Sequence, residues 1–150
     1  MKRFKNILLV CDFDVNQNSA VDRAVSLARQ NDAKLTLVTV VKDISSNMGM
    51  AITAITPQEI FDLVLNDCQQ QIDGLVADIG EQGVEAKSLV ITGTPFLEVI
   101  RQVLRHEHDL VILGAEGKDG IKERLFGSTS MHLMRKCPCP VWVVKPAKRT

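Results

Sequence analysis

Apolar runs and amphipathic stretches alternate along the entire chain. Continuous apolar runs are typical of strands buried in a parallel sheet, and they occur at Phe4–Val10, Lys34–Val41, Glu85–Ile91, Asp109–Leu113 and Val141–Val144. Between them, apolar residues recur at steps of three and four, the period of a helix with one buried face. This alternation predicts an α/β fold, a five-stranded parallel sheet with helices on both faces.

Four helices are predicted, and the second has the clearest start. Thr56 is a capping residue, Pro57 suits the first helical position, and Glu59 completes a capping box. Gly80 and Gly83 are expected to end this long helix. The other helices are predicted over Asn18–Gln30, from Thr94-Pro95 onwards, and over Ser130–Lys136.

The stretch from Lys42 to Ile55 has no clear period and is predicted to be a loop. Two roles are open for this loop. Its methionines would suit a surface that binds a partner, or the loop folds as a lid over its own domain.

The composition bounds the class of protein. With 150 residues, 45% of them hydrophobic and 24% charged, the chain is predicted to be one soluble domain, residues 1–150. Eighteen basic and eighteen acidic side chains cancel, so neither nucleic acid nor a membrane is expected as a partner. The apolar run that follows Lys2 and Arg3 is too short for a signal peptide or a membrane span, so a cytoplasmic location is expected.

The cysteines and histidines give weak signals for metal or redox chemistry. Cys11, Cys68 and the pair Cys137-Pro138-Cys139 lack the spacing of a zinc site, and the pair is one residue shorter than the redox motif C-x-x-C. Reduced, structural thiols are therefore expected. His106 and His108 resemble a metal pair without a third ligand and are expected to face solvent, whereas His132 is expected to be structural.

The segment Gly114–Thr129 combines glycines and hydroxyls between a strand and a helix. Glycine lets the backbone approach a ligand closely, and unpaired N–H groups at a helix start favour an anion, so a phosphate-binding loop is predicted. It is not a Walker A loop, because Ile112 stands where the first glycine belongs and Asp119 replaces the hydroxyl. A Rossmann fingerprint is also excluded, because residues 11–16 after the first strand contain no glycine.

The remaining pattern is G-x2-G-x9-G-[ST], formed by Gly114, Gly117, Gly127 and Ser128. Together with Ile7-Leu-Leu-Val-Cys-Asp12, Thr94-Pro95, Asp109-Leu-Val-Ile-Leu-Gly114 and Pro140-Val-Trp-Val-Val-Lys145-Pro146, it makes the whole chain resemble the universal stress protein family, in its ATP-binding branch. The resemblance implies a Rossmann-like sheet of the adenine nucleotide alpha-hydrolase type, with strand order 3-2-1-4-5. It also implies a homodimer in which the fifth strand, Val141–Val144, pairs or packs against its copy.

The same resemblance implies a nucleotide site. Asp12 would contact the nucleoside, Val40 would offer backbone contacts to adenine, and Leu113 would line the adenine pocket. The glycines and hydroxyls would hold the ribose and phosphates of ATP, ADP or AMP, with Mg²⁺ as a companion ion and no protein metal ligand assigned. The full set is Val10, Asp12, Val40, Leu113, Gly114, Gly117, Gly127, Ser128 and Thr129.

Alternatives remain open within this set. Asp12 would also suit a helix cap or a turn, and Gly114 and Gly117 would suit a simple turn. Glu116 departs from the family, in which many members have a non-acidic residue at that position. Its carboxylate would repel phosphates, face solvent, or help to hold a divalent cation.

Three functions follow from the sequence. The first is a cytoplasmic, ATP-binding regulatory module of the stress response that acts as a homodimer on an unidentified protein partner. The second is an enzyme, at most a slow ATPase or a phosphotransferase, for which no catalytic residue stands out. The third is an interaction protein of the same fold that binds no nucleotide. The intact glycines and Ser128 favour the first.

Overall fold

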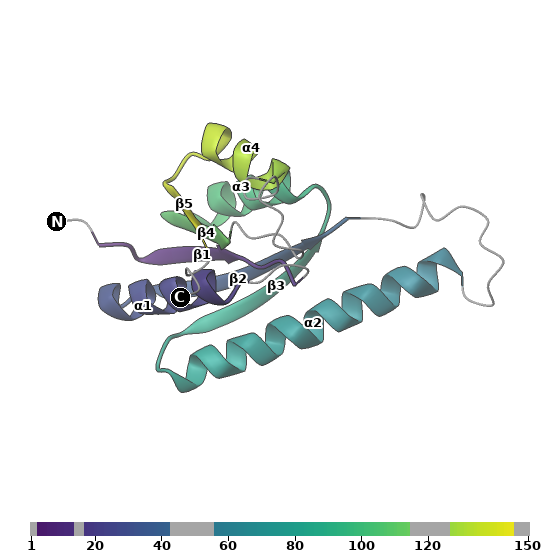
Figure 1. The fold of residues 1–150 in the computed structure, drawn as a ribbon, viewed down its shortest axis with the longest axis horizontal. Helices are drawn as coiled ribbons and strands as arrows, with labels where there is room; N and C mark the ends of the chain where they lie inside the picture. The colour runs from purple at the N-terminus through teal and green to yellow at the C-terminus, as the bar shows by residue number, and fades with distance from the viewer. Residues whose placement is uncertain (1–2, 14–16, 43–55, 115–126, 146–150) are drawn as a thin grey trace, which may run out of the picture.

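The predicted sheet and its strand order are confirmed. A computed structural model describes residues 3–13, 17–42, 56–114 and 127–145. Their five strands form one parallel sheet in the order β3-β2-β1-β4-β5 (Figure 1). The strands are β1 (Asn6–Val10), β2 (Lys34–Val41), β3 (Ala86–Thr92), β4 (Leu110–Gly114) and β5 (Val141–Val144). The helices are α1 (Asn18–Asn31), α2 (Pro57–Glu81), α3 (Pro95–His106) and α4 (Ser128–Lys136).

Two hydrophobic clusters fill the two faces of this sheet. Figure 1 shows α1 and α2 on one side and α3 and α4 on the other. Successive strand residues point to opposite faces, so Leu9 packs under α1 and α2 while its neighbour Leu8 packs under α3 and α4. Both leucines are fully buried, which explains why the central strands read as continuous apolar runs.

The strand and helix ends differ from the sequence predictions by one or two residues. β1 begins at Asn6 rather than Phe4, since its pairing with β2 starts at Asn6, and the backbone N–H groups of Lys5 and Asn6 both donate to the Asp109 carboxylate. β4 extends to Gly114, which pairs with Val144. α4 begins at Ser128 rather than Ser130, because Gly127 serves as its N-cap.

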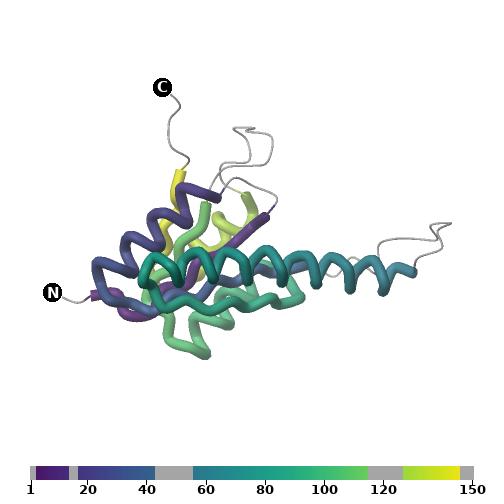
Figure 2. Tube along the Cα trace, turned by 90° about the horizontal axis from the view of Figure 1, so that it is seen from below, coloured from purple at the N-terminus to yellow at the C-terminus, as the bar shows by residue number. Residues whose placement is uncertain are grey.

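The long helix α2 starts as the sequence predicts. The Thr56 hydroxyl accepts a hydrogen bond from the backbone N–H of Glu59 at 3.1 Å, and Pro57 is the first helical residue. Figure 2 shows the first turns of α2 extending past the body of the sheet. Within the described ranges, no helix combines the length and the hydropathy needed to cross a membrane.

The expectation that both histidines of His106-Glu107-His108 face solvent is wrong for one of them. His106 is exposed, whereas His108 is only 5% exposed. His108 lies in the short connection between the end of α3 and the start of β4, and its side chain is buried there. The loop predicted over residues 42–55 falls outside the described residues from position 43 onwards.

Candidate functional site

The central strand β1 ends before its neighbours do. Val10 is its last residue and pairs with Val38 of β2 and Leu113 of β4. Beyond this row, β2 continues to Val41 beside β3, and β4 adds Gly114. We use the name recess for the step at the edge of the sheet where β1 stops short, between Val40 on β2 and Gly114 on β4. It lies at the carboxyl edge of the sheet, between β1 and β4, where the strand order reverses and ligands of such sheets bind.

Three of the predicted adenine-pocket residues share one face of the sheet at the recess. Val10, Val40 and Leu113 all pack in the cluster beneath α3 and α4. Leu113 is 6% exposed, and Val10 and Val40 are half-buried. The structure therefore brings these residues together as apolar walls on the α3/α4 side.

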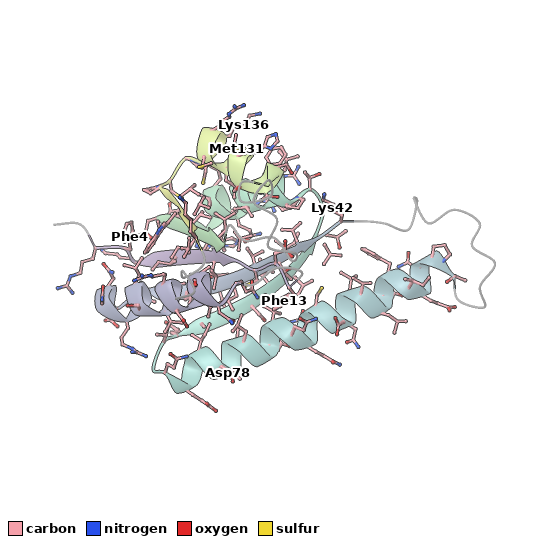
Figure 3. The ribbon with its side chains drawn as sticks, in the orientation of Figure 1. Phe4, Phe13, Lys42, Asp78, Met131 and Lys136 are labelled. Atoms are coloured by element: carbon pink, nitrogen blue, oxygen red, sulfur yellow. The ribbon has the colours of Figure 1, made fainter. Side chains whose placement is uncertain are left out.

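Asp12 leaves β1 at the same point. Cys11 and Phe13 pack in the cluster beneath α1 and α2, and Phe13 is labelled at the end of β1 in Figure 3. Asp12 lies between these two neighbours, beyond the end of β1, and is exposed. Its backbone N–H is fixed by the Gln17 side-chain oxygen at 2.9 Å, a contact that sequence reasoning missed. Gln17 is the N-cap residue of α1, so the start of that helix helps to hold Asp12 in place.

The N-terminus of α4 approaches the same edge from the α3/α4 layer. α4 connects two parallel strands, β4 and β5, so its first turn lies at the carboxyl edge and its last turn at the amino edge. Among the described residues, no side chain caps its first N–H groups. Ser128 is exposed and Thr129 is half-buried, so hydroxyls accompany these backbone donors. A helix start of this kind suits a phosphate group.

The backbone of Gly127 does not itself require glycine. Its φ of −60° and ψ of 167° are accessible to any residue. A Cβ atom built there meets no atom within 4 Å among the described residues. Open space beside an uncapped helix start fits a ligand that must approach the backbone closely.

His132 fixes the first turn of α4. Its ring stacks on Phe96, with ring centroids 4.2 Å apart and an interplanar angle of 14°. Its Nδ1 lies 2.6 Å from the carbonyl oxygen of Ser128, to which a protonated Nδ1 donates. The structural role predicted for His132 is confirmed, and the ring ties the start of α4 to the start of α3.

The other face of the sheet carries a groove that includes none of the predicted site residues. It has a volume of about 590 Å³ and lies between α1 and α2. Carboxamides dominate its polar lining, and Asp22 and Asp78 add negative charge. The groove suits a phosphate less well than the start of α4 does, because its charged lining residues are acidic. Its lining residues are Phe13, Gln17, Asn18, Val21, Asp22, Gln70, Gln71, Gly74, Leu75 and Asp78.

Two predicted features lie outside the described residues. Gly117 and the departure at Glu116 both fall between positions 115 and 126. Within the described ranges, no group of three His, Cys, Asp or Glu side chains is arranged to hold a metal ion. The remaining predicted residues lie at the carboxyl edge: on β1, β2 and β4, just after β1 at Asp12, and from the N-cap Gly127 into the first turn of α4.

Solved structures with the same fold include three universal stress proteins. The chain is similar to UspA from Lactobacillus plantarum, with a TM-score of 0.77, 23% identity, and coverage of 96% of this chain and 99% of that one. It is also similar to the protein from Archaeoglobus fulgidus in complex with dAMP, with a TM-score of 0.68, 14% identity, and coverage of 96% and 100%. A family protein from Arabidopsis thaliana with AMP bound gives a TM-score of 0.58, 18% identity, and coverage of 95% and 92%. These likenesses establish the fold.

Sequence comparison identifies the family. The chain is 24% identical over 147 residues to universal stress protein YxiE of Bacillus subtilis, covering 95% of this chain and 99% of YxiE. It is 32% identical over 153 residues to universal stress protein E of Escherichia coli, covering 97% of this chain but only 46% of that longer protein. Residues 3–145 match the universal stress protein family as a whole. The chain therefore belongs to the universal stress protein family.

Proposed function

We propose that this protein binds ATP, or its products ADP and AMP, at the recess, and that binding regulates a partner protein during stress. The observation that carries the proposal is the convergence of the recess with the uncapped start of α4 on the α3/α4 side of the sheet. Relatives of the same fold bind dAMP and AMP, which supports an adenine nucleotide as the ligand class.

Each part of the site suits one part of the nucleotide. Val10, Val40 and Leu113 form an apolar wall against which a flat adenine ring packs. The Asp12 carboxylate accepts hydrogen bonds from ribose hydroxyls or the adenine amino group. Backbone N–H groups and hydroxyls at Ser128 and Thr129 donate to phosphate oxygens.

We further propose that the protein works as a cytoplasmic homodimer joined through β5. This strand is at the edge of the sheet, paired with β4 on one side within the described sheet. Trp142 of β5 is 37% exposed, and an exposed apolar edge strand invites pairing with a second copy. Light scattering gives the mass of the particle in solution, and a monomer at micromolar concentration contradicts this part of the proposal alone.

Isothermal titration calorimetry of the purified protein with ATP, in the presence and absence of Mg²⁺, tests nucleotide binding. The expected result is saturable heat with one nucleotide per chain, together with release of adenine nucleotide from the protein as purified, identified by mass spectrometry after denaturation. Absence of both heat and co-purified nucleotide contradicts the proposal and favours an interaction protein of the same fold. Turnover of bound ATP to ADP would instead favour a slow ATPase.

A further inference from the structure

The turn between α4 and β5 brings two thiols together. Cys137 is the C-cap residue of α4, and Cys139 follows two residues later, just before β5. Their sulfur atoms are 3.7 Å apart and share a hydrogen bond. Both residues are half-buried, and they pack at the margin of the cluster beneath α3 and α4. Sulfur atoms in a disulfide are about 2.05 Å apart, so a movement of about 1.6 Å joins this pair.

The backbone on both sides of the two thiols is anchored. The N–H of Cys137 donates to the carbonyl oxygen of Leu133 at 2.9 Å, and the carbonyl oxygen of Pro140 accepts from Val111 at 3.0 Å. Pro138 restricts the backbone between the cysteines. Because both flanks are fixed, the thiols meet without first ordering a flexible loop, which favours an intramolecular reaction between them.

The surroundings of Cys139 disfavour its ionisation. Burial, followed by the charge and the hydrogen bond of Cys137, raises the pKa of Cys139 to about 12. The Asp109 carboxylate raises this pKa further. Cys139 therefore keeps its proton near neutral pH, and its thiol donates to the carbonyl oxygen of Pro140 at 3.6 Å. In its contact with Cys137, either sulfur can be the donor. Because the thiolate is the form that attacks a disulfide, the raised pKa makes Cys139 a poor first nucleophile, and we assign the first attack to Cys137.

We propose that Cys137 and Cys139 form a redox-active dithiol that exchanges with low-molecular-weight disulfides of the glutathione type. The Cys137 thiolate attacks one sulfur of the disulfide, forms a mixed disulfide and releases one thiolate. That thiolate takes the proton of Cys139, and the Cys139 sulfur then attacks Cys137 and expels the second thiolate. Overall, two protein thiols and one small disulfide become one protein disulfide and two small thiols.

Formation of the mixed disulfide prepares the second step. It removes the negative charge from Cys137, which is one cause of the raised Cys139 pKa. Cys139 therefore loses its proton more readily after the first exchange than before it. The two thiols follow Lys136, the last residue of α4, which is labelled in Figure 3. They precede β5 and so lie at the amino edge of the sheet, opposite the recess.

Mass spectrometry of the whole protein tests the proposal. The reduced protein is incubated with oxidised glutathione, alkylated and digested with trypsin, which cuts after Lys136 and Lys148 but not before Pro146. Peptide 137–148 then contains both cysteines and is expected to be unalkylated and lighter by two hydrogen atoms. The half-buried Cys68 on α2 provides the comparison within the same sample and is expected to be alkylated. Alkylation of both cysteines in peptide 137–148, or a lasting glutathione adduct there, overturns the proposal.

Serine variants test the order of attack. Cys139→Ser is expected to accumulate glutathione on Cys137, because the second thiol is missing. Cys137→Ser keeps the burial that is the largest cause of the raised Cys139 pKa, and it is expected to react at Cys139 at least about ten-fold more slowly than Cys139→Ser reacts at Cys137. Equal rates in these two variants overturn the assignment of Cys137 as the attacking thiol. Circular dichroism of both variants confirms that they are folded before the rates are compared.

Discussion

The side-chain carboxylate of Asp109 accepts a hydrogen bond from the backbone N–H of Lys5 at 2.7 Å, although 104 residues separate them in the chain. Its other oxygen accepts from the N–H of Asn6 at 3.1 Å. These bonds join the start of β4 to the start of β1, at the edge of the sheet opposite the recess. One carboxylate therefore ties the first residues of the central strand to the start of β4.

Removing this carboxylate should destabilise the fold without affecting the site. Asp109→Ala leaves two backbone donors without their charged acceptor, and we expect a loss of about 1.5–3 kcal/mol in the free energy of unfolding. Urea denaturation measures this loss. Asp62→Ala is the control, because Asp62 accepts only an exposed side-chain bond from Gln58 on α2 and should cost less than about 0.5 kcal/mol. Equal losses in the two variants would show that the Asp109 bonds contribute no more than a surface contact.

Gly127→Val should separate nucleotide binding from stability. The added side chain meets open space in the described structure, so the free energy of unfolding should fall by about 1 kcal/mol or less, the cost of a poor N-cap residue. It would occupy the space of a bound phosphate, and we expect ATP affinity to fall at least about a hundred-fold, or ~2.7 kcal/mol. Calorimetry measures the affinity. Gly80→Val on α2, also with nothing within 4 Å of its Cβ, should bind ATP normally. Unchanged affinity in Gly127→Val would place the phosphates elsewhere.

A pair of aspartates distinguishes the recess from the groove between α1 and α2. Asp12 stands at the end of β1, whereas Asp22 lines the groove. If adenine nucleotide binds at the recess, Asp12→Ala should weaken binding about ten-fold, or ~1.4 kcal/mol, by removing a charged hydrogen-bond acceptor. Asp22→Ala should leave binding unchanged. The opposite pattern, measured by the same titration, would move the ligand to the α1/α2 face.

His108 should make stability depend on pH. It is buried, and its Nδ1 has no hydrogen-bond partner among the described residues. Burial lowers the pKa of His108 from its ordinary 6.5, assisted by the charges of His106 and Lys87 and opposed by the Asn6 backbone and Asp109. As the pH falls below 6.5, the unfolded chain gains a proton that the folded chain resists, so folding stability falls until the pH passes the folded-state pKa.

Urea midpoints between about pH 7.5 and about pH 5.5 measure this effect, which is at most about 1.4 kcal/mol per pH unit for one proton. His108→Leu should reduce the slope over this range, whereas His106→Gln, a change at an exposed histidine, should retain most of it. An unchanged slope in His108→Leu would assign the pH dependence to other groups.

Local signals in the sequence predicted most of the fold. The bounds of β2 and β5 agree with the apolar runs, because each run is bounded by polar or proline residues. The start of α2 was also predicted, because its signals are local: the Thr56 side chain accepts from the N–H of Glu59, three residues later, and Pro57 is the first helical residue. β1 was predicted two residues too long, because the apolar Phe4 extends the run although the pairing with β2 begins only at Asn6.

The site was predicted less completely than the fold. Family spacing located Gly127 and Ser128, but it could not show that Gln17 holds the N–H of Asp12 or that His132 stacks on Phe96. Such contacts between side chains of different elements leave no periodic signal. The burial of His108 was also missed. A single residue between a helix and a strand belongs to neither the helical nor the strand periodicity, so its burial leaves no periodic signal.

The early end of β1 also has a kinetic consequence. Its flanks are positioned by the parallel register of β2 and β4. If adenine binds there as proposed, it meets strands that the sheet itself holds in place, so little chain entropy should be lost at these strand ends. We therefore expect association to be limited by encounter and orientation rather than by refolding, so that variants along these strands should change the residence time of the nucleotide more than its rate of arrival.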